Sequence, residues 1–261
     1  MNAGVCTVAV DLPKTLAFDL GNGVYLEMKL IPAGTFIMGS PESEAERSDD
    51  ETQHQVTISK PYYLGKYPIT QAQWQQVMRN NPSHFKGKKL LPVENVSWDD
   101  TQAFCLKLKE ITRVPFGIPT EAQWEYACRA GTNTPFHFGS ELNGRQDNCD
   151  GTVPYGTYSE GPYLKKTTTV GIDKYPANAW GLYDMHGNVW EWCSDWEGDY
   201  PTGSVTDPNG PATGSYRVLR GGSWLYVAVS CRSARRNGFV PSGRSGFLGF
   251  RVALSSSGIP K

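Results

Sequence analysis

Hydrophobic and polar positions alternate with a period of two near the start of the chain. Leu26, Met28 and Leu30 are separated by charged residues, a Pro-Ala-Gly turn follows, and a second apolar stretch comes after it. This pattern predicts a β-hairpin over residues 24–40. Residues 40–53 then hold six acidic side chains and no apolar residue larger than Ala. Such a composition predicts a solvated loop.

Three later stretches begin with a Ser or Thr that can cap a helix. These starts are Thr70 with Gln73, which form a capping box, Ser97 with Asp100, and Thr120 with Gln123. In the second helix, Phe104, Leu108 and Ile111 fall on one face and predict its buried side. The third helix is predicted to stop at Gly131, a residue suited to the left-handed conformation that closes a helix.

From about residue 132 onward helical periodicity disappears, and Gly, Pro, Asn and aromatic residues dominate. We therefore predict an α+β fold, loop-rich with short strands and about three helices. No internal repeat and no Pro- or Ser-rich linker divides the chain. We expect a single domain over residues 21–254, with residues 1–20 as an N-terminal extension and residues 255–261 as a tail, both frayed.

Charge and composition exclude several classes of function. Lys and Arg number 25 and Asp and Glu 26, so the formal net charge is −1 and we expect no nucleic-acid partner. No apolar run approaches the ~18 residues of a membrane span, and the first residues lack a basic leader. We therefore expect no membrane span and a cytoplasmic protein. The six cysteines have no Cys-x-x-Cys spacing, which predicts mostly buried free thiols.

Five motifs occur in the same order as in one known family. They are Ile31-Pro-Ala-Gly-Thr-Phe-Ile-Met-Gly, Pro92-Val-Glu-Asn-Val-Ser-Trp, Pro119-Thr-Glu-Ala-Gln-Trp-Glu-Tyr-Ala, Gly181-Leu-Tyr-Asp-Met-His-Gly-Asn-Val-Trp-Glu-Trp and Arg220-Gly-Gly-Ser-Trp. Together they resemble the formylglycine-generating enzyme (sulfatase-modifying factor) family over about residues 24–254. The resemblance implies a C-type-lectin-like, formylglycine-generating-enzyme-type fold.

The resemblance also implies where a catalytic site would lie. Active oxidases of the family carry two cysteines five residues apart, shortly after the Gly-Gly-Ser motif, and these bind copper as a thiolate pair. Here Tyr226 stands at the first position, and Cys231 follows five residues later within a framework motif. Because a lone thiol cannot form that site, we expect no copper and no enzymatic activity. The alternatives are a copper-dependent oxidase that uses Cys231 and Ser223, or a fixed regulatory domain that binds one protein partner.

The motif from Asp184 to Glu191 places two carboxylates around a tight bend. The resemblance implies a structural Ca²⁺ held by the side chains of Asp184 and Glu191 and the backbone carbonyls of Gly187 and Val189. The alternative is that both acids cap turns and pair with nearby arginines. His186 lies in the same motif without a nearby nucleophile, so we interpret it as a hydrogen-bonded structural residue.

Two kinds of position alternate in residues 220–251. Framework positions match the family motifs and are Gly221, Gly222, Ser223, Trp224, Cys231, Arg232, Ser233, Ala234, Arg236, Pro241, Arg244, Gly249, Phe250 and Arg251. Between them lie fifteen positions that relatives commonly fill with Asn and other polar residues. We call these the variable positions, and they are Leu225, Tyr226, Val227, Ala228, Val229, Ser230, Arg235, Gly238, Phe239, Val240, Ser242, Gly243, Ser245, Gly246 and Phe247. We expect the framework arginines to fix the loops so that the variable side chains point outward.

The variable positions share a genetic property. None is Lys, Gln, Glu, Met or Trp, and all fifteen can arise by randomising the two adenines of an Asn codon. On this fold, such a segment resembles the variable protein of a diversity-generating retroelement, in which error-prone reverse transcription at adenines rewrites binding residues. We therefore expect a binding protein whose partner is a protein or another macromolecule.

The outward orientation has a consequence for three aromatic residues. Replacing Tyr226, Phe239 and Phe247 together by Ser is expected to leave the melting temperature nearly unchanged. The alternative is that residues 225–229 form a buried strand, which Leu-Tyr-Val-Ala-Val would suit by β-propensity.

Overall fold

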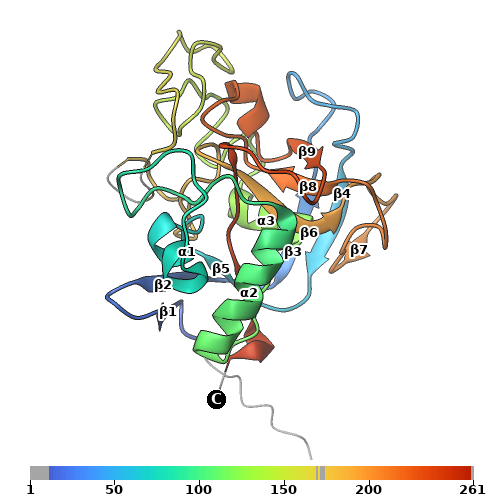
Figure 1. Cartoon of the computed structure of the whole chain (residues 1–261). Helices are drawn as coiled ribbons and strands as arrows, with labels where there is room; N and C mark the ends of the chain where they lie inside the picture. Colours follow the sequence, from blue (N-terminus) through green and yellow to red (C-terminus); the bar gives the residue numbers. More distant parts are fainter. Residues whose placement is uncertain (1–11, 169, 171–173, 260–261) are drawn as a thin grey trace, which may run out of the picture.

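The computed structural model describes residues 12–168, 170 and 174–259, which fold into three small β-sheets with three α-helices beside them (Figure 1). Residues 131–168 consist almost entirely of turns, bends and isolated bridges. The predicted α+β class, with three helices and a loop-rich second half, is confirmed.

The first two sheets have four strands each. The first has the order β1-β2-β5-β11, with β1 (Thr15–Asp19), β2 (Tyr25–Ile31), β5 (Tyr62–Gly65) and β11 (Ala253–Ser255), all antiparallel. The second has the order β10-β6-β8-β9, with β6 (Trp190–Trp196), β8 (Arg217–Arg220), β9 (Arg236–Phe239) and β10 (Leu248–Gly249). The variable positions therefore lie on and between the strands of the second sheet.

A third sheet and two short 3₁₀ helices complete the strands and turns. The sheet has the order β3-β4-β7, with β3 (Gly34–Met38), β4 (His54–Ile58) and β7 (Val205–Thr206). The 3₁₀ helices are η1 (Ala228–Cys231) and η2 (Ser256–Gly258).

The helices α1 (Gln71–Met78), α2 (Trp98–Thr112) and α3 (Glu121–Arg129) begin where the capping residues predict. In each, the capping hydroxyl and the side chain three residues later bond reciprocally to backbone N–H groups, which satisfies donors that a helix start leaves free. None of the described helices combines the length and the apolar character needed to cross a membrane.

Two details of the helix predictions are wrong. Phe104 and Leu108 are fully buried, but Ile111 is 43% exposed because it lies in the last turn of α2, beyond the apolar core. At the end of α3, Ala130 and not Gly131 is the first left-handed residue, with φ of 46°, and Gly131 follows it with φ of 92°.

Two predictions about the N-terminal strands are also wrong. β2 and β3 do not pair with each other, because β2 lies between β1 and β5 while β3 pairs with β4 in another sheet. Residues 24–40 therefore form no hairpin. Residues 15–19, predicted to be a frayed extension, are β1, and the ring of Phe18 packs edge-on against Phe116 at 5.0 Å.

The C-terminal tail begins later than predicted. Residues 255–258 complete β11 and form η2, and Ser255 pairs with Tyr62 of β5. The edge of the first sheet therefore includes part of the predicted tail.

An apolar core joins the first two sheets to α1 and α2. Trp74 stacks on Phe104 with ring centroids 5.4 Å apart, and Phe250 meets both rings edge-on. Trp190 and Trp192 of β6 belong to the same core. The loop that contains η1 lies over this core, at the opposite end of the molecule from β1 (Figure 1). The core thus supports the segment that carries most of the variable positions.

Candidate ligand-binding surface

Two buried arginines, Arg220 and Arg236, connect the variable segment (residues 220–251) to α3. Arg220 forms an ion pair with Glu125 and donates to the three consecutive backbone carbonyls of residues 233–235 at 2.8 Å. Arg236 donates to both oxygens of Glu121 at 2.7 and 3.0 Å. A bidentate pair of this kind has a defined geometry, so the arginines fix the backbone of β8 and β9 relative to α3. Sequence analysis missed the two glutamates, although their spacing of four on a capped helix places them on one face.

A third buried arginine holds the acidic loop of residues 40–53. Arg232 donates to Glu44 at 2.6 Å and to both oxygens of Glu51 at 2.8 Å. Glu51 is fully buried. Its burial favours a raised pKa, but the hydrogen bonds from Arg232 outweigh it and hold the pKa of Glu51 below its ordinary value. The predicted solvated loop is confirmed for most of residues 40–53, but Ser40 and Glu51 near its ends are buried, and Glu51 is bound by Arg232 of the variable segment.

The other framework arginines also bind carboxylates. Arg251 donates to both oxygens of Glu191 at 2.6 and 2.7 Å and to the carbonyl of Gly65. Arg244 is exposed and donates to both oxygens of Asp100 at 2.8 and 2.9 Å. The predicted role of the framework arginines in fixing loops is confirmed.

Burial in this segment follows the division into framework and variable positions. Fourteen of the fifteen variable residues keep exposed surface, whereas eleven of the fourteen framework residues are buried. Ala228 is the exception among the variable residues, because its methyl group packs beside Cys149 and Cys231. The alternative of a buried strand at residues 225–229 is wrong: this stretch is a turn that leads into η1, and Leu225 is 41% exposed.

The glycines of the segment divide in the same way. Gly222 of the framework has φ of +72°, and a Cβ added there would lie 2.4 Å from the sulfur of Cys231. At the variable positions Gly238, Gly243 and Gly246, φ is not left-handed, so the backbone conformation suits any L-residue. An added Cβ has free space at Gly246, but at Gly238 the side chain of Glu197 and at Gly243 the ring of Phe239 must move to admit it. Gly222, by contrast, cannot be replaced without backbone strain.

Three variable aromatic residues have one face on the core. Tyr226 packs edge-on against Trp190 at 5.6 Å and against Phe247 at 5.4 Å, and Phe239 lies 6.4 Å from Trp192. Each is only partly exposed. Replacing all three by Ser is therefore expected to destabilise the fold, contrary to the expectation from sequence, because the inner faces of the rings contribute apolar burial.

His186 is fully buried beneath the segment with both ring nitrogens bonded. Its Nδ1 donates to the carbonyl of Cys231 at 2.8 Å, and its Nε2 accepts from the backbone N–H of His137 at 3.0 Å. Burial lowers the pKa of His186 well below its ordinary value, so the ring is neutral. The thiol of Cys128 lies 3.6 Å away, but burial raises its pKa to about 12. This arrangement matches the structural role predicted for His186.

The four residues predicted to bind calcium differ in what already bonds to their oxygens. Glu191 accepts from Arg251 on both oxygens and from the indole nitrogen of Trp124 at 2.7 Å. Pairing with an arginine, the alternative expected from sequence, therefore holds for Glu191. The carbonyl of Gly187 accepts from the N–H of Val189 at 2.9 Å. Within the described chain, no three His, Cys, Asp or Glu side chains gather as a metal site.

Unlike Glu191, Asp184 forms no ion pair with another described residue. One of its oxygens accepts from Asn188 at 3.1 Å, while Oδ2 is buried and has no hydrogen-bond partner among the described residues. Burial and the neighbouring carboxylate of Asp147 raise the pKa of Asp184 well above its ordinary value. Of the predicted calcium ligands, Asp184 is thus the side chain whose surroundings suit a cation.

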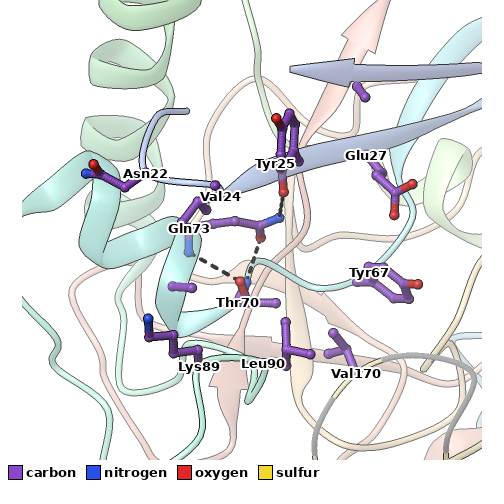
Figure 2. Close-up of a pocket in the computed structure, with 13 residues that line it drawn as sticks. Asn22, Val24, Tyr25, Glu27, Tyr67, Thr70, Gln73, Lys89, Leu90 and Val170 are labelled. Carbon is purple, nitrogen blue, oxygen red and sulfur yellow. Dashed lines mark hydrogen bonds between the residues drawn. The ribbon is translucent and has the colours of Figure 1, made fainter. Parts of the chain in front are cut away.

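Five cavities of the described chain have no variable position in their walls. The cavity of about 720 Å³ in Figure 2 lies beside β2 and the start of α1. Thr70 and Gln73 in its wall bond to each other, and Gln73 also donates to the carbonyl of Tyr25. Glu27 and Lys89 lie on opposite sides of it (Figure 2). The polar groups of Thr70 and Gln73 in the wall of this cavity are already hydrogen-bonded to each other or to Tyr25. The variable positions are therefore the better candidate for a ligand site.

Comparisons with known proteins agree with this architecture. Residues 22–256 match the family model described as a sulfatase-modifying factor enzyme 1-like domain. The formylglycine-generating enzyme of Streptomyces coelicolor is 39% identical over 66% of this chain and 55% of its own length, and an inactive C-alpha-formylglycine-generating enzyme 2 of Mus musculus is 34% identical over 74% and 58%. The chain spans about half the length of the curated relatives it matches.

One solved structure is similar over nearly the whole of both chains. Treponema denticola variable protein 1 superimposes with a TM-score of 0.80 and 32% identity, covering 94% of this chain and 100% of that one. The fold expected from the sequence motifs is therefore confirmed.

Proposed function

Because the chain belongs to the sulfatase-modifying factor enzyme 1-like domain family, we propose that it uses the fold of this family as a fixed scaffold for a diversified ligand-binding surface. The surface consists of the fifteen variable positions. The similarity to Treponema denticola variable protein 1 supports this proposal. In this proposal the chain is a binding protein and not an oxidase.

The observation that carries the proposal is the match between codon pattern and geometry. Fourteen of the fifteen positions that can derive from an Asn codon keep exposed surface, and the glycines among them have backbone conformations that other residues can adopt. Framework positions between them are buried in ion pairs and close packing. Exposed substitutions usually change stability by less than about 0.5 kcal/mol, so many sequences can share such a backbone.

The shape of the surface favours a protein or another macromolecule as the partner. Small molecules bind in concave sites, and the five cavities described above lie away from the variable positions. Tyr226, Phe239 and Phe247 are held by the core and present partly exposed rings, with Leu225 and Val240 more exposed beside them. Rigid aromatic anchors among small residues are typical of protein-binding surfaces.

Copper-dependent oxidation is the alternative function. The side chain at the first cysteine position is Tyr226, and the thiol of Cys231 is fully buried. Burial and the neighbouring thiol of Cys149 raise the pKa of Cys231 well above its ordinary value, so it is protonated at neutral pH and a poor copper ligand. We expect no oxygen consumption with copper and a cysteine-containing peptide. Consumption that disappears in Cys231→Ser would overturn the proposal.

The decisive test is to sequence the DNA that flanks the gene. The proposal requires a near-copy of the segment that encodes residues 220–251, together with a gene for a reverse transcriptase. The copy should differ from the gene only where the copy has adenine, and the differing codons should be those of the variable positions. If no such copy exists in the complete genome, the surface is not diversified by this route and the chain is a fixed binding domain.

We also propose a cytoplasmic location. The five described cysteines are buried free thiols, as predicted, while Cys6 lies outside the described residues. Unpaired cysteines in this number are typical of a reducing compartment. Fractionation of the native host that recovers the chain outside the cytoplasm would contradict this location.

A structural calcium ion at Asp184 remains part of the proposal. The unpartnered Oδ2 of Asp184 and the nearby carboxylate of Asp147 supply hard oxygen donors. We expect CaCl₂ to raise the melting temperature of the chelator-treated protein and to have no such effect on Asp184→Asn. MgCl₂ serves as the control for ionic strength. A shift that is equal in the variant would remove Asp184 from the site.

A further inference from the structure

Two of the variable residues, Phe239 and Gly243, lie against each other at one edge of the second sheet. Phe239 is the last residue of β9 and pairs with Arg217 of β8, and β9 is the edge strand (Figure 1). The chain then turns, and the backbone N–H of Gly243 donates to the carbonyl of Val240 at 2.9 Å. This turn brings the backbone of Gly243 beside the ring of Phe239.

The backbone on both sides of this contact is held in place. The N–H of Trp98, at the start of α2, donates to the carbonyl of the framework residue Pro241 at 2.9 Å and so fixes the turn. Pairing with β8 fixes the backbone of Phe239. When a side chain changes at either position, the side chains must therefore adapt to each other, because the backbones are restrained.

One space has to serve both side chains. A Cβ added at Gly243 would lie 2.2 Å from Cε1 and 2.5 Å from Cδ1 of Phe239, and 3.1 Å from Cγ2 of Val240. Carbon atoms that are not bonded do not approach so closely, so a side chain at residue 243 needs the space in which the Phe239 ring now lies. The φ of Gly243 is not left-handed, so its backbone can carry any L-residue. The conflict is therefore between two side chains.

The Phe239 ring is held in this space by the core. Its centroid lies 6.4 Å from that of Trp192, and the ring packs at the margin of the apolar core. Phe239 is also partly exposed, so its ring can turn to solvent at the cost of its apolar contact with Trp192. A ring held in one orientation is the better anchor for a partner, because less side-chain entropy is lost on binding.

We propose that residues 239 and 243 form one coupled pair that determines specificity at this edge of the binding surface. With Gly at residue 243, an aromatic residue at 239 packs on Trp192 and presents its outer edge as a rigid anchor for an apolar group of a protein partner. With a larger residue at 243, the ring at 239 is displaced toward solvent and the anchor is lost. The role in binding rests on the function proposed above, whereas the exclusion between the two side chains does not.

Gly246 lacks such a relation to another variable side chain. The nearest atoms to an added Cβ there are 3.6 Å away and belong to Glu94 and His84, which are not variable positions. A methyl group at residue 246 therefore fits without displacing the ring of Phe239. This glycine of the same segment is thus the matched control for Gly243.

A double-mutant cycle on the full chain, measured by thermal unfolding, tests the pair. Gly243→Ala should lower the melting temperature by about 3–6 °C when Phe239 is present, because the ring loses its place on Trp192. In the Phe239→Ala background the same substitution should change the melting temperature by less than about 2 °C, because the space is free. Gly246→Ala should change it by less than about 2 °C in both backgrounds.

Fluorine NMR of protein labelled with para-fluorophenylalanine shows whether the ring itself moves. The resonance of residue 239 is the one that disappears in Phe239→Leu. In Gly243→Ala this resonance should move toward that of the free amino acid and broaden more strongly when a soluble gadolinium complex is added, because the ring turns to solvent. In Gly246→Ala it should stay unchanged.

Equal effects of Gly243→Ala with and without Phe239, or an unchanged fluorine resonance, would overturn the coupled pair. A loss that depends on Phe239, together with a displaced resonance, supports it. The flanking DNA tests diversification separately. Coupling without a near-copy of the segment in the genome would support the pair and overturn diversification, and a near-copy with equal effects in both backgrounds would do the reverse.

Discussion

The turn at residues 184–191 and the segment at residues 225–247 are both conspicuous in the sequence, but they have opposite surroundings in the structure. Every residue of the turn is buried, and at its centre both ring nitrogens of His186 are bonded to backbone groups. In the segment, all variable positions except Ala228 keep exposed surface. An unusual motif can therefore mark a buried, fully hydrogen-bonded turn in one region and a partly exposed surface in another.

The two regions are physically connected. The carbonyl of Cys231 accepts from His186, and the N–H of Trp224 donates to the carbonyl of Asn188, so the turn forms the floor on which the segment rests. In the segment, side chains that contact the turn at residues 184–191 are restricted in size and shape by packing. Side chains that point away from the turn are restricted only by the conformation of their own backbone. This difference explains how a fixed interior and a variable exterior can alternate within one short segment.

The largest expected effect comes from removing a buried charge of the framework. Arg232→Ala should lower the free energy of unfolding by about 3–5 kcal/mol, because the fully buried Glu51 then keeps only the longer ion pair with Arg235 at 3.8 Å. The control is Arg244→Ala, whose ion pair with Asp100 is half exposed and should contribute less than about 1 kcal/mol. Urea unfolding followed by circular dichroism measures both. Equal losses in the two variants would mean that the framework is not a distinct layer.

A matched pair of glycines compares the turn with the segment directly. A Cβ at Gly187 would lie 2.4 Å from the backbone carbonyl oxygen of Asn148, so Gly187→Ala should lower the free energy of unfolding by about 2–3 kcal/mol. At Gly246 the nearest atoms to an added Cβ are 3.6 Å away, and Gly246→Ala should change it by less than about 0.5 kcal/mol. Thermal unfolding of the two variants checks this difference. A loss at Gly246 as large as that at Gly187 would contradict the variable surface.

Within the segment, partly buried and exposed side chains should differ. Tyr226→Ser should lower the free energy of unfolding by about 1–2 kcal/mol, because one face of the ring packs on Trp190. Leu225→Ser, at a position 41% exposed, should change it by about 0.5 kcal/mol or less. Chemical denaturation resolves both values. If the two variants behave alike, the aromatic side chains are not anchored by the core.

The last expected effect appears only as the pH rises and concerns a buried carboxyl in the strand that follows the turn. Burial, assisted by the charge of Glu121, raises the pKa of Asp195 from 3.8 to about 7. Folding therefore favours the protonated form, and the folded state loses stability as the pH rises from about 4 through 7. Asp195→Asn cannot ionise and should be more stable than the wild type at pH 8, with no gain at pH 4. Melting curves at the two pH values test this. A gain that is independent of pH would show that ionisation is not its cause.

Local features of the sequence were sufficient for several predictions. The starts of the three helices follow from Thr70, Ser97 and Thr120, because a capping box is completed within four residues. Family motifs identified the fold, and the codon pattern separated framework from variable positions without any knowledge of burial. These inferences depend on residues that are close together in the chain, so tertiary contacts are not needed to make them.

Other features were decided only by the tertiary structure. Arg232 and Glu51 are 181 residues apart, so no local pattern could show that the acidic loop is bound by the variable segment. The same holds for the bidentate pair of Glu191 and Arg251, which are 60 residues apart in the chain. Identical residue types carry opposite roles at Gly222 and Gly246, because the fold places one against Cys231 and leaves the other open. The sequence by itself determined the helix starts and the family, and it is the basis for proposing the variable positions. The tertiary structure decided which charges are paired and which faces are buried, because both depend on atoms brought together from distant parts of the chain.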